Sequence, residues 1–86
     1  MEYVTNVIDG DTFETSSGHP RVRLANVNTP ERGAPGYAAA KNALTRLVLN
    51  KYVTIQTNAH DVYGRRVAHV WVGSTHVNAI MKQYSR

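Results

Sequence analysis

The sequence contains no cysteine, so disulfide bonds and thiolate metal sites are excluded. No apolar run approaches the roughly 20 residues that a membrane-spanning helix requires, and no membrane association is expected. A signal peptide is not visible either, because the β-forming pattern begins at Tyr3, directly after the first methionine. These absences leave the location open between the cytoplasm and secretion after processing.

Acidic residues are few: six Asp and Glu oppose ten Lys and Arg, which gives a formal net charge of +4. A basic surface attracts polyanions, and nucleic acid is the first candidate among them. Many small domains carry a similar excess only for solubility. Charge therefore favours nucleic-acid binding but does not establish it.

The length of 86 residues and a hydrophobic fraction of 42% predict a single domain over residues 1–86 with one modest core. Runs of β-forming residues, separated by turn signals such as Asp9-Gly10 and "SSGHP", predict strands over residues 3–8, 12–15, 21–27, 52–57 and 67–72. Helical spacing of apolar residues predicts helices over residues 37–49, ending near Asn50, and 77–84. The order β-β-β-α-β-β-α predicts mainly β structure with helices (α+β) and matches a five-stranded OB-type barrel. Sandwiches of the α+β class share this order.

Polar clusters interrupt the predicted strands at three places. Asp9 and Asp11 offer hard anionic oxygens, the ligands that Ca²⁺ and Mg²⁺ prefer, and Asn28 and Thr29 add neutral oxygens. A carboxylate at Glu31, after a stiffening proline, could take a proton from water. Arg23 and Arg65 could each grip a phosphate with a bidentate fork. Together these groups are the components of phosphodiester hydrolysis.

Each cluster also has an ordinary interpretation. Asp-Gly is a common hairpin signal, "NTPE" could be a turn or a helix entry with Glu31 solvated, and "YGR" could end a loop. The joint appearance of all three clusters at strand ends is what favours a single site.

The motifs "VIDGDTF", "VRLANVNTPE" and "DVYGRR", in this order, resemble the staphylococcal (micrococcal) nuclease family, also called thermonuclease or SNase-like. The resemblance covers nearly the whole chain, from Tyr3 through "HVNAIMKQY". It implies an OB-fold, Ca²⁺-dependent nuclease that cleaves DNA and RNA and leaves 3′-phosphate ends.

The resemblance also assigns roles to individual residues. Asp11, Asn28 and Thr29 match the direct calcium ligands, the last through its backbone carbonyl, and Asp9 lies in the outer shell. Glu31 matches the general base, and Arg23 and Arg65 match the arginines that hold the phosphate and its transition state. Tyr63 matches a tyrosine that hydrogen-bonds a phosphate. Gly10 is expected to let the backbone bend between the two aspartates.

Three departures from the family pattern carry further expectations. Asn28 stands where the founding enzyme has a second aspartate, so calcium binding should be weaker. The loop over residues 32–36 is short, which should reduce substrate steering. The family's final helix has no counterpart before Arg86, so the surface that it would cover is expected to be exposed, lined by smaller side chains or buried by another subunit. Weak self-association is expected through the apolar residues Val77, Ile80 and Met81.

The histidines His19, His60, His69 and His76 show no spacing suited to a shared metal. His69 has apolar neighbours, which favours a packed or hydrogen-bonded ring over a catalytic one. Trp71 is expected in the core rather than as a stacking platform.

Two alternatives to the nuclease hypothesis remain open at this point. A non-catalytic OB-fold nucleic-acid binding module is favoured by Asn28, but it gives no chemical reason for Glu31 and both arginines. A protein-interaction domain is favoured only by the short chain. The nuclease hypothesis itself requires that residues far apart in the sequence gather around one pocket.

Overall fold

The computed structural model describes residues 1–18 and 20–86, and His19, in the predicted turn "SSGHP", lies outside the described residues. The strands are β1 (Glu2–Asp9), β2 (Thr12–Thr15), β3 (Val22–Leu24), β4 (Tyr52–His60), β5 (Arg66–Val72) and β6 (Thr75–His76). The helices are α1 (Tyr37–Val48), α2 (Val77–Met81) and a final 3-10 turn, η1 (Lys82–Tyr84). No described helix is long and apolar enough to cross a membrane.

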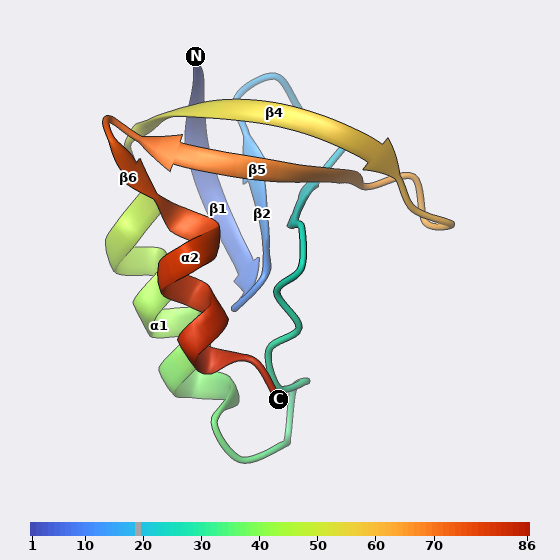
Figure 1. The fold of residues 1–86 in the computed structure, drawn as a ribbon, viewed down its shortest axis with the longest axis vertical. Coiled ribbons are helices and arrows are strands. Elements are labelled where there is room, and N and C mark those ends of the chain that lie inside the picture. Colours follow the sequence, from blue (N-terminus) through green and yellow to red (C-terminus); the bar gives the residue numbers. More distant parts are fainter. Residues whose placement is uncertain (19) are drawn as a thin grey trace.

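The strands close into a barrel. Their order in the sheet is β3-β2-β1-β4-β5-β6, and a parallel pairing between β3 and β5 joins the two sides. Figure 1 shows the long β4–β5 ribbon crossing over β1 and β2, with α1 and α2 side by side below one of its ends. The mixed α+β class and the closed barrel confirm the prediction, and both are consistent with the OB type.

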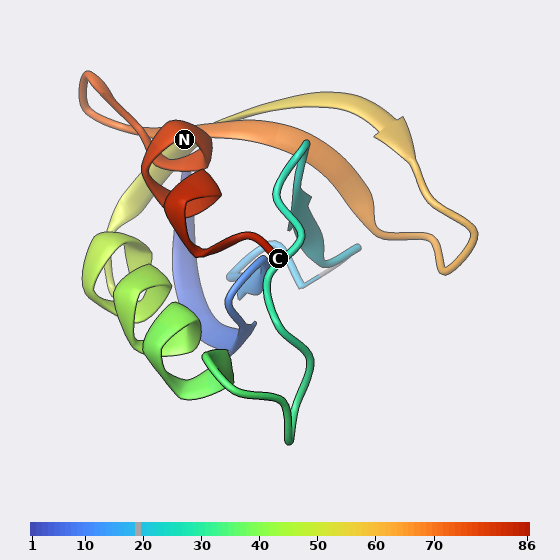
Figure 2. The same cartoon turned by 60° about the horizontal axis from the view of Figure 1, so that its bottom comes forward.

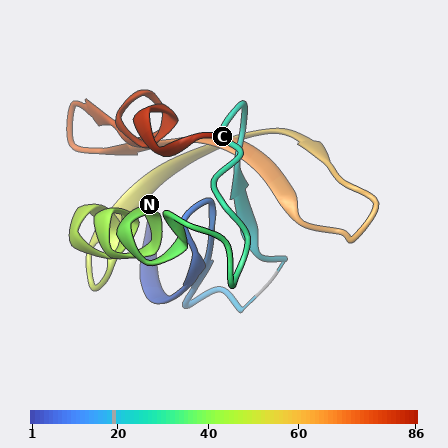
Figure 3. The ribbon, with the colours of Figure 1, turned by 90° about the horizontal axis from the view of Figure 1, so that it is seen from below.

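The predicted boundaries need three corrections. The third strand is confined to Val22–Leu24, because the chain turns at Asn26, which has a positive φ of 61°. Strand β4 continues to His60, and its hairpin with β5 projects from the molecule in Figures 2 and 3. The short strand β6 was not predicted, and the last helix is a five-residue α2 followed by η1.

Helix α1 begins and ends where the sequence supplies residues that tolerate positive φ. Gly36 precedes it with φ 89°, and Asn50 follows it with φ 61°, which confirms Asn50 as the residue that stops the helix. Its buried face consists of Ala40, Ala43, Leu44 and Val48. The hydroxyl of Tyr37 donates to the backbone carbonyl of Ile8 at 3.2 Å. The start of α1 is therefore tied to the end of β1.

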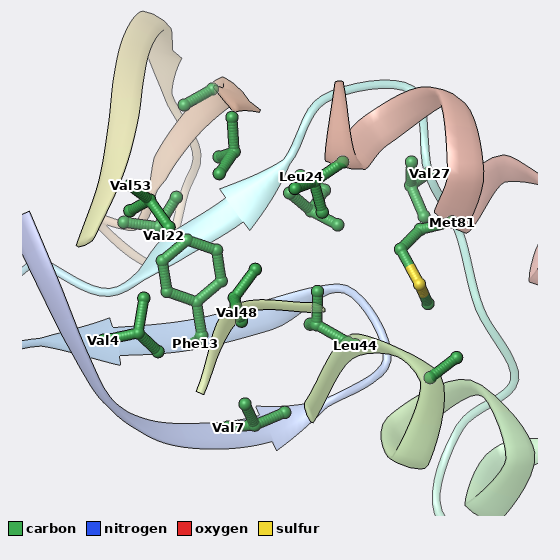
Figure 4. Packing of buried hydrophobic residues seen from close by; sticks show 14 of the residues in the cluster. Val4, Val7, Phe13, Val22, Leu24, Val27, Leu44, Val48, Val53 and Met81 are labelled. Carbon is green, nitrogen blue, oxygen red and sulfur yellow. The ribbon is translucent and has the colours of Figure 1, made fainter. Parts of the chain in front are cut away.

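The core fills the space between the barrel and the two helices. In Figure 4 the Phe13 ring lies among Val4, Val22 and Val48, while Met81 approaches from α2. Met81 and Val77 are fully buried in this core. The apolar residues that suggested self-association are thus largely covered within one chain, which removes the reason for that expectation, while self-association itself stays a prediction.

Trp71 corrects another expectation, since it is only half-buried. Ala68 and Val70 occupy the inward positions of β5, and strand alternation places Trp71 on the other face with His69. There the Trp71 ring stacks on His76, with ring centroids 4.9 Å apart. The His69 ring is hydrogen-bonded, as expected, and its partner is His76. The two histidines are therefore in contact, although their spacing in the sequence did not suggest a shared metal.

Candidate functional site

One end of the barrel carries a small polar cavity of about 150 Å³. The turn after β1, the segment after β3 and the loop before β5 meet there. Seven of the residues singled out in the sequence line it together with Pro30: Asp9, Asp11, Arg23, Asn28, Thr29, Glu31 and Arg65. The structure therefore brings these residues together around one pocket, as the nuclease hypothesis requires. The roles assigned to them stay predictions.

Asp11 is the most firmly held carboxylate of the cavity. Its Oδ1 accepts the Thr12 hydroxyl at 2.9 Å, and its Oδ2 accepts the backbone N–H of Thr29 at 3.3 Å. The residue is only 8% exposed. Asp11 thereby fixes the segment after β3 to the start of β2.

Arg23 is held by backbone carbonyls more than by acids. Its Nη1 donates to the carbonyls of Leu24 at 2.9 Å and Val27 at 2.7 Å, and its Nη2 lies 3.5 Å from Oδ2 of Asp11. Neutral carbonyls orient the guanidinium without cancelling its charge. Its Nε makes no hydrogen bond to the described residues, and its Nη2 has only the ion-pair contact with Asp11.

Asp9 differs from Asp11 in its electrostatics. Burial raises the pKa of Asp9 above its usual range, and the neighbouring Asp11 carboxyl raises this pKa further. The backbone N–H of Asp11 donates to Oδ1 of Asp9 at 3.3 Å and acts in the opposite direction. Two carboxylates thus lie close together, and a cation between them would relieve their repulsion.

Gly10 lies in the turn after β1, as expected, and it is also needed for space. Its φ is not positive, but a Cβ there would lie 2.6 Å from the Ala40 Cβ and 2.7 Å from the Thr29 Oγ1. The turn after β1 is therefore pressed against both α1 and the Thr29 segment. The Thr29 hydroxyl oxygen is buried and finds no hydrogen-bond partner among the described residues.

Arg65 is positioned by Asp61, whose importance the sequence analysis missed. Oδ2 of Asp61 accepts from the Arg65 Nε at 2.7 Å, while Oδ1 accepts the backbone N–H groups of Tyr63 and Arg65. These contacts hold the pKa of Asp61 below its usual range, against the effect of burial. The Asx-turn pattern of Asp61 in "DVYGR" was a signal that could have revealed this role.

Tyr63 is the one predicted residue that the structure does not bring into the cavity. Its side chain is 81% exposed, and the Arg65 guanidinium lies 5.2 Å from its ring centroid. Tyr63 and Arg65 line a neighbouring open depression of about 680 Å³ together with Arg21. Tyr63 therefore lies beside the candidate site, and Arg65 links the two.

Glu31 and Asn28 lie at the solvent-exposed rim. The Glu31 carbonyl accepts the Ala34 N–H at 2.9 Å, which shapes the loop, and Glu31 is one of the residues that line the cavity. Asn28 is held by the end of the chain: its N–H donates to the Ser85 hydroxyl, and its carbonyl accepts the Arg86 N–H at 2.9 Å. Nothing in the sequence indicated this contact, because the partners are 57 and 58 residues away.

The donor chemistry of the cavity fits a hard divalent cation such as Ca²⁺. It combines the carboxylates of Asp9 and Asp11 with the neutral oxygens of Asn28 and Thr29, and all of these are oxygen donors. Within the described residues, no three His, Cys, Asp or Glu side chains gather into one group.

Comparisons with known proteins agree with the geometry. The sequence model of the family described as "Staphylococcal nuclease homologue" matches residues 21–84. The chain is 34% identical over 71 residues to Protein ParB of Escherichia coli and 35% identical over 85 residues to a thermonuclease of Staphylococcus intermedius. It is 31% identical over 91 residues to a micrococcal nuclease of Shigella flexneri. These matches cover 80%, 87% and 93% of this chain but only 40%, 51% and 52% of the relatives, so the chain spans about half their length or less.

Proposed function

Because the chain belongs to the staphylococcal nuclease family, we propose that it is a metal-dependent nuclease that hydrolyses phosphodiester bonds in DNA and RNA. The observation that carries this proposal is the convergence of carboxylates, amide and two arginines on one small cavity. The net charge of +4 supports a polyanionic substrate.

The two arginines bind the scissile phosphate from two neighbouring strands. Arg23 lies in β3, with its guanidinium fixed by two carbonyls, and Arg65 directly precedes β5, which pairs with β3, with its guanidinium fixed by Asp61. Charges oriented before the substrate arrives need no reorganisation when negative charge develops in the transition state. Tyr63, next to Arg65, contacts a neighbouring phosphate.

Glu31 orients the attacking water and accepts its proton. Its exposed position at the rim lets water reach it directly, and it lines the same cavity as both arginines. A general base must lie within hydrogen-bond reach of the proton it removes, and the loop turn at Ala34 sets that position.

Asp11, Asn28 and the Thr29 carbonyl would hold Ca²⁺, with Asp9 in the outer shell. When bound, the ion would polarise the phosphate and neutralise charge that develops on its oxygens. The hydrogen bond from the Thr29 N–H to Asp11 holds these two residues next to each other before the ion binds.

The proposal is tested by incubating the chain with single-stranded DNA, with Ca²⁺ and then with a chelator. Fragments that bear 3′-phosphates and depend on the metal are expected. DNA that stays intact at every calcium concentration would overturn the proposal.

A second candidate, a non-catalytic nucleic-acid binding module, is favoured by the surroundings of Asn28. The Oδ1 of Asn28, the oxygen that would replace a carboxylate ligand, lies 3.4 Å from the Arg86 Nη2. A cationic neighbour there disfavours a bound cation. In the same assay this candidate predicts a DNA strand that is shifted in a gel but remains intact.

A further inference from the structure

A second polar cluster lies on the outer face of the barrel, away from the residues assigned to the nuclease cavity. His69 of β5 and His76 of β6 face each other across the hairpin, with the Nδ1 of His69 3.0 Å from the Nε2 of His76. They line a cavity of about 220 Å³ with Ala25, Asn26, Asn78, Ala79 and Lys82. None of these residues has a part in the proposed cleavage.

We propose that His69 and His76 form a binding site for a late transition-metal ion, and that the bound ion is Zn²⁺ or Cu²⁺. Neutral imidazole nitrogens are preferred ligands of these ions, whereas Ca²⁺ prefers oxygen. The site is therefore chemically distinct from the carboxylate cavity.

The distance between the two nitrogens suits a shared metal. With a zinc–nitrogen bond of about 2.0–2.1 Å and a tetrahedral angle, two ligating nitrogens lie about 3.3 Å apart. The observed 3.0 Å is slightly shorter. Because the hydrogen-bonded nitrogens point at one another, the rings must separate a little and tilt so that both lone pairs meet at the metal. The metal takes the place of the hydrogen shared between the two nitrogens. The ring that donated it carries its proton on the other ring nitrogen instead, by exchange with solvent, so both rings ligate as neutral imidazoles.

Neighbouring groups hold the two rings in place. His76 is stacked on Trp71, with an interplanar angle of 18°, and it pairs within the β5–β6 hairpin. Below the pair, Asn78 is buried and fully used: its Oδ1 accepts the Val70 N–H, and its Nδ2 donates to the carbonyls of Ala25 and Ala68. Asn78 therefore fixes the cavity floor and does not compete as a ligand.

Two protein ligands make this an open site. Within the described residues no third histidine or carboxylate joins the pair, so water completes the coordination. Lys82 also lines the cavity, and its charge opposes a cation. The site is consequently weaker than a closed structural zinc site, which has four protein ligands.

The first test uses the unchanged chain. Zinc sulfate is titrated into it at mildly alkaline pH, and the imidazole nitrogens are followed by NMR. The signals of His69 and His76 should shift together, whereas the exposed His60 should not move, and CaCl₂ should leave both rings unaffected. If zinc bound only at the Asp9–Asp11 cavity, the NMR signals of His69 and His76 would stay unchanged. That result would overturn the proposal.

The second test uses variants with a matched control. His69→Gln and His76→Gln should each weaken zinc binding in calorimetry by at least about tenfold, the lower bound for loss of even a supporting partner. His60→Gln, a change of the same kind on β4, should bind as the unchanged chain does. Wild-type affinity in both site variants would contradict the proposal, and the NMR test does not depend on whether the variants fold.

A third readout comes from Trp71, the single tryptophan of the chain. Because its ring stacks on His76, Cu²⁺ at the pair should quench its fluorescence. Quenching should be lost in His76→Gln and retained in His60→Gln. Equal quenching in both variants would place the copper elsewhere and overturn the assignment.

Discussion

The two ends of strand β1 use the same kinds of residue in opposite ways. At one end, the Glu2 carboxylate accepts two bonds from the Arg66 guanidinium, at 2.8 and 2.9 Å, and two more from Thr15 and Ser17. The bidentate Arg66 contact, with help from these hydroxyls, lowers the pKa of Glu2 to about 2. Both oxygens of the Glu2 carboxylate therefore have hydrogen-bond partners, and these contacts join β1, β2 and β5 where the barrel closes.

At the other end, the acids and the arginines are incompletely paired. Burial and the nearby Asp11 raise the pKa of Asp9, the Arg23–Asp11 contact is 3.5 Å long, and the Thr29 hydroxyl has no partner among the described residues. Native structures seldom leave buried polar groups in such a state unless a ligand completes them. The difference supports the proposal that the Asp9 end binds a ligand, whereas the Glu2 end stabilises the fold.

The largest expected effect follows from removing an arginine at the binding end. Arg65→Ala should lower the cleavage rate by at least about a hundredfold, the usual effect of losing one preorganised donor. Its guanidinium is bound by Asp61 in an exposed hairpin, so the fold should survive. Single-turnover cleavage of DNA measures this.

Arg21→Ala is the matched control for that experiment. Arg21 is a nearby arginine that pairs with Glu14 on the surface and does not line the small cavity. It should keep most of the activity. A full-rate Arg65→Ala enzyme would show that the assigned role is wrong.

Gly10→Ala should disturb the binding end through packing. The added methyl would press on Ala40 and on the Thr29 hydroxyl, and overpacking of this kind costs about 1–3 kcal/mol. The Thr29 N–H should also move from Asp11, so activity should fall together with stability. Urea denaturation and cleavage assays check both, and unchanged stability would contradict the close approach at Gly10.

Neutralising one acid at each end should change stability in opposite directions. Glu2→Gln should lower the free energy of unfolding by about 1–3 kcal/mol at neutral pH, because it breaks charged hydrogen bonds. Asp9→Asn, in metal-free buffer, should raise it, because it removes a carboxylate whose charge is disfavoured by burial and by Asp11. Chemical denaturation of both variants measures this, and destabilisation by both would break the contrast between the ends.

The pKa values of these two acids also predict how the free energy of unfolding depends on pH. The pKa of Glu2 is depressed in the folded chain, so its contribution is present above 4.5 and is lost as the pH falls towards about 2. The pKa of Asp9 is raised, so its contribution is present below the ordinary value of 3.8 and is lost as the pH rises through the folded value. Glu2→Gln should therefore flatten the acid limb of the stability curve.

The smallest effect is expected from Asn28→Asp, which restores a carboxylate at the rim. It should tighten calcium binding by about tenfold, since affinity in oxygen sites follows the ligand charge. Calorimetry with CaCl₂ measures the change. An unchanged affinity would show that Asn28 is not a ligand.

Much of the fold could be predicted because the local signals agree with the global structure. The order of the main strands and the helix over residues 37–49 follow from periodicity, and Asn50 marks the end of that helix. The two-residue β6 is too short to show a period, and β4 extends through polar residues that only its pairing with β5 stabilises.

The candidate site was only partly accessible from sequence. The residues around the cavity were named from their chemistry at the strand ends, and their individual roles came from the family resemblance. The support from Asp61 had an Asx-turn signal, but the contacts of Ser85 with Asn28 and of His69 with His76 depend on tertiary pairing that no local pattern encodes. Trp71 was misplaced because an apolar neighbourhood in sequence does not reveal which face of a strand turns inward.

The contrast between the two ends of β1 is tested most directly by titrating CaCl₂ into three proteins: the unchanged chain, Glu2→Gln and Asp11→Asn. Calcium should bind the first two with equal affinity and lose its binding to Asp11→Asn, because Asp11 is a proposed calcium ligand, whereas Glu2 lies at the other end of β1 and is paired with Arg66. Calcium binding that persists in Asp11→Asn, or that is absent from the unchanged chain, would contradict the assignment of that end as a metal-dependent site.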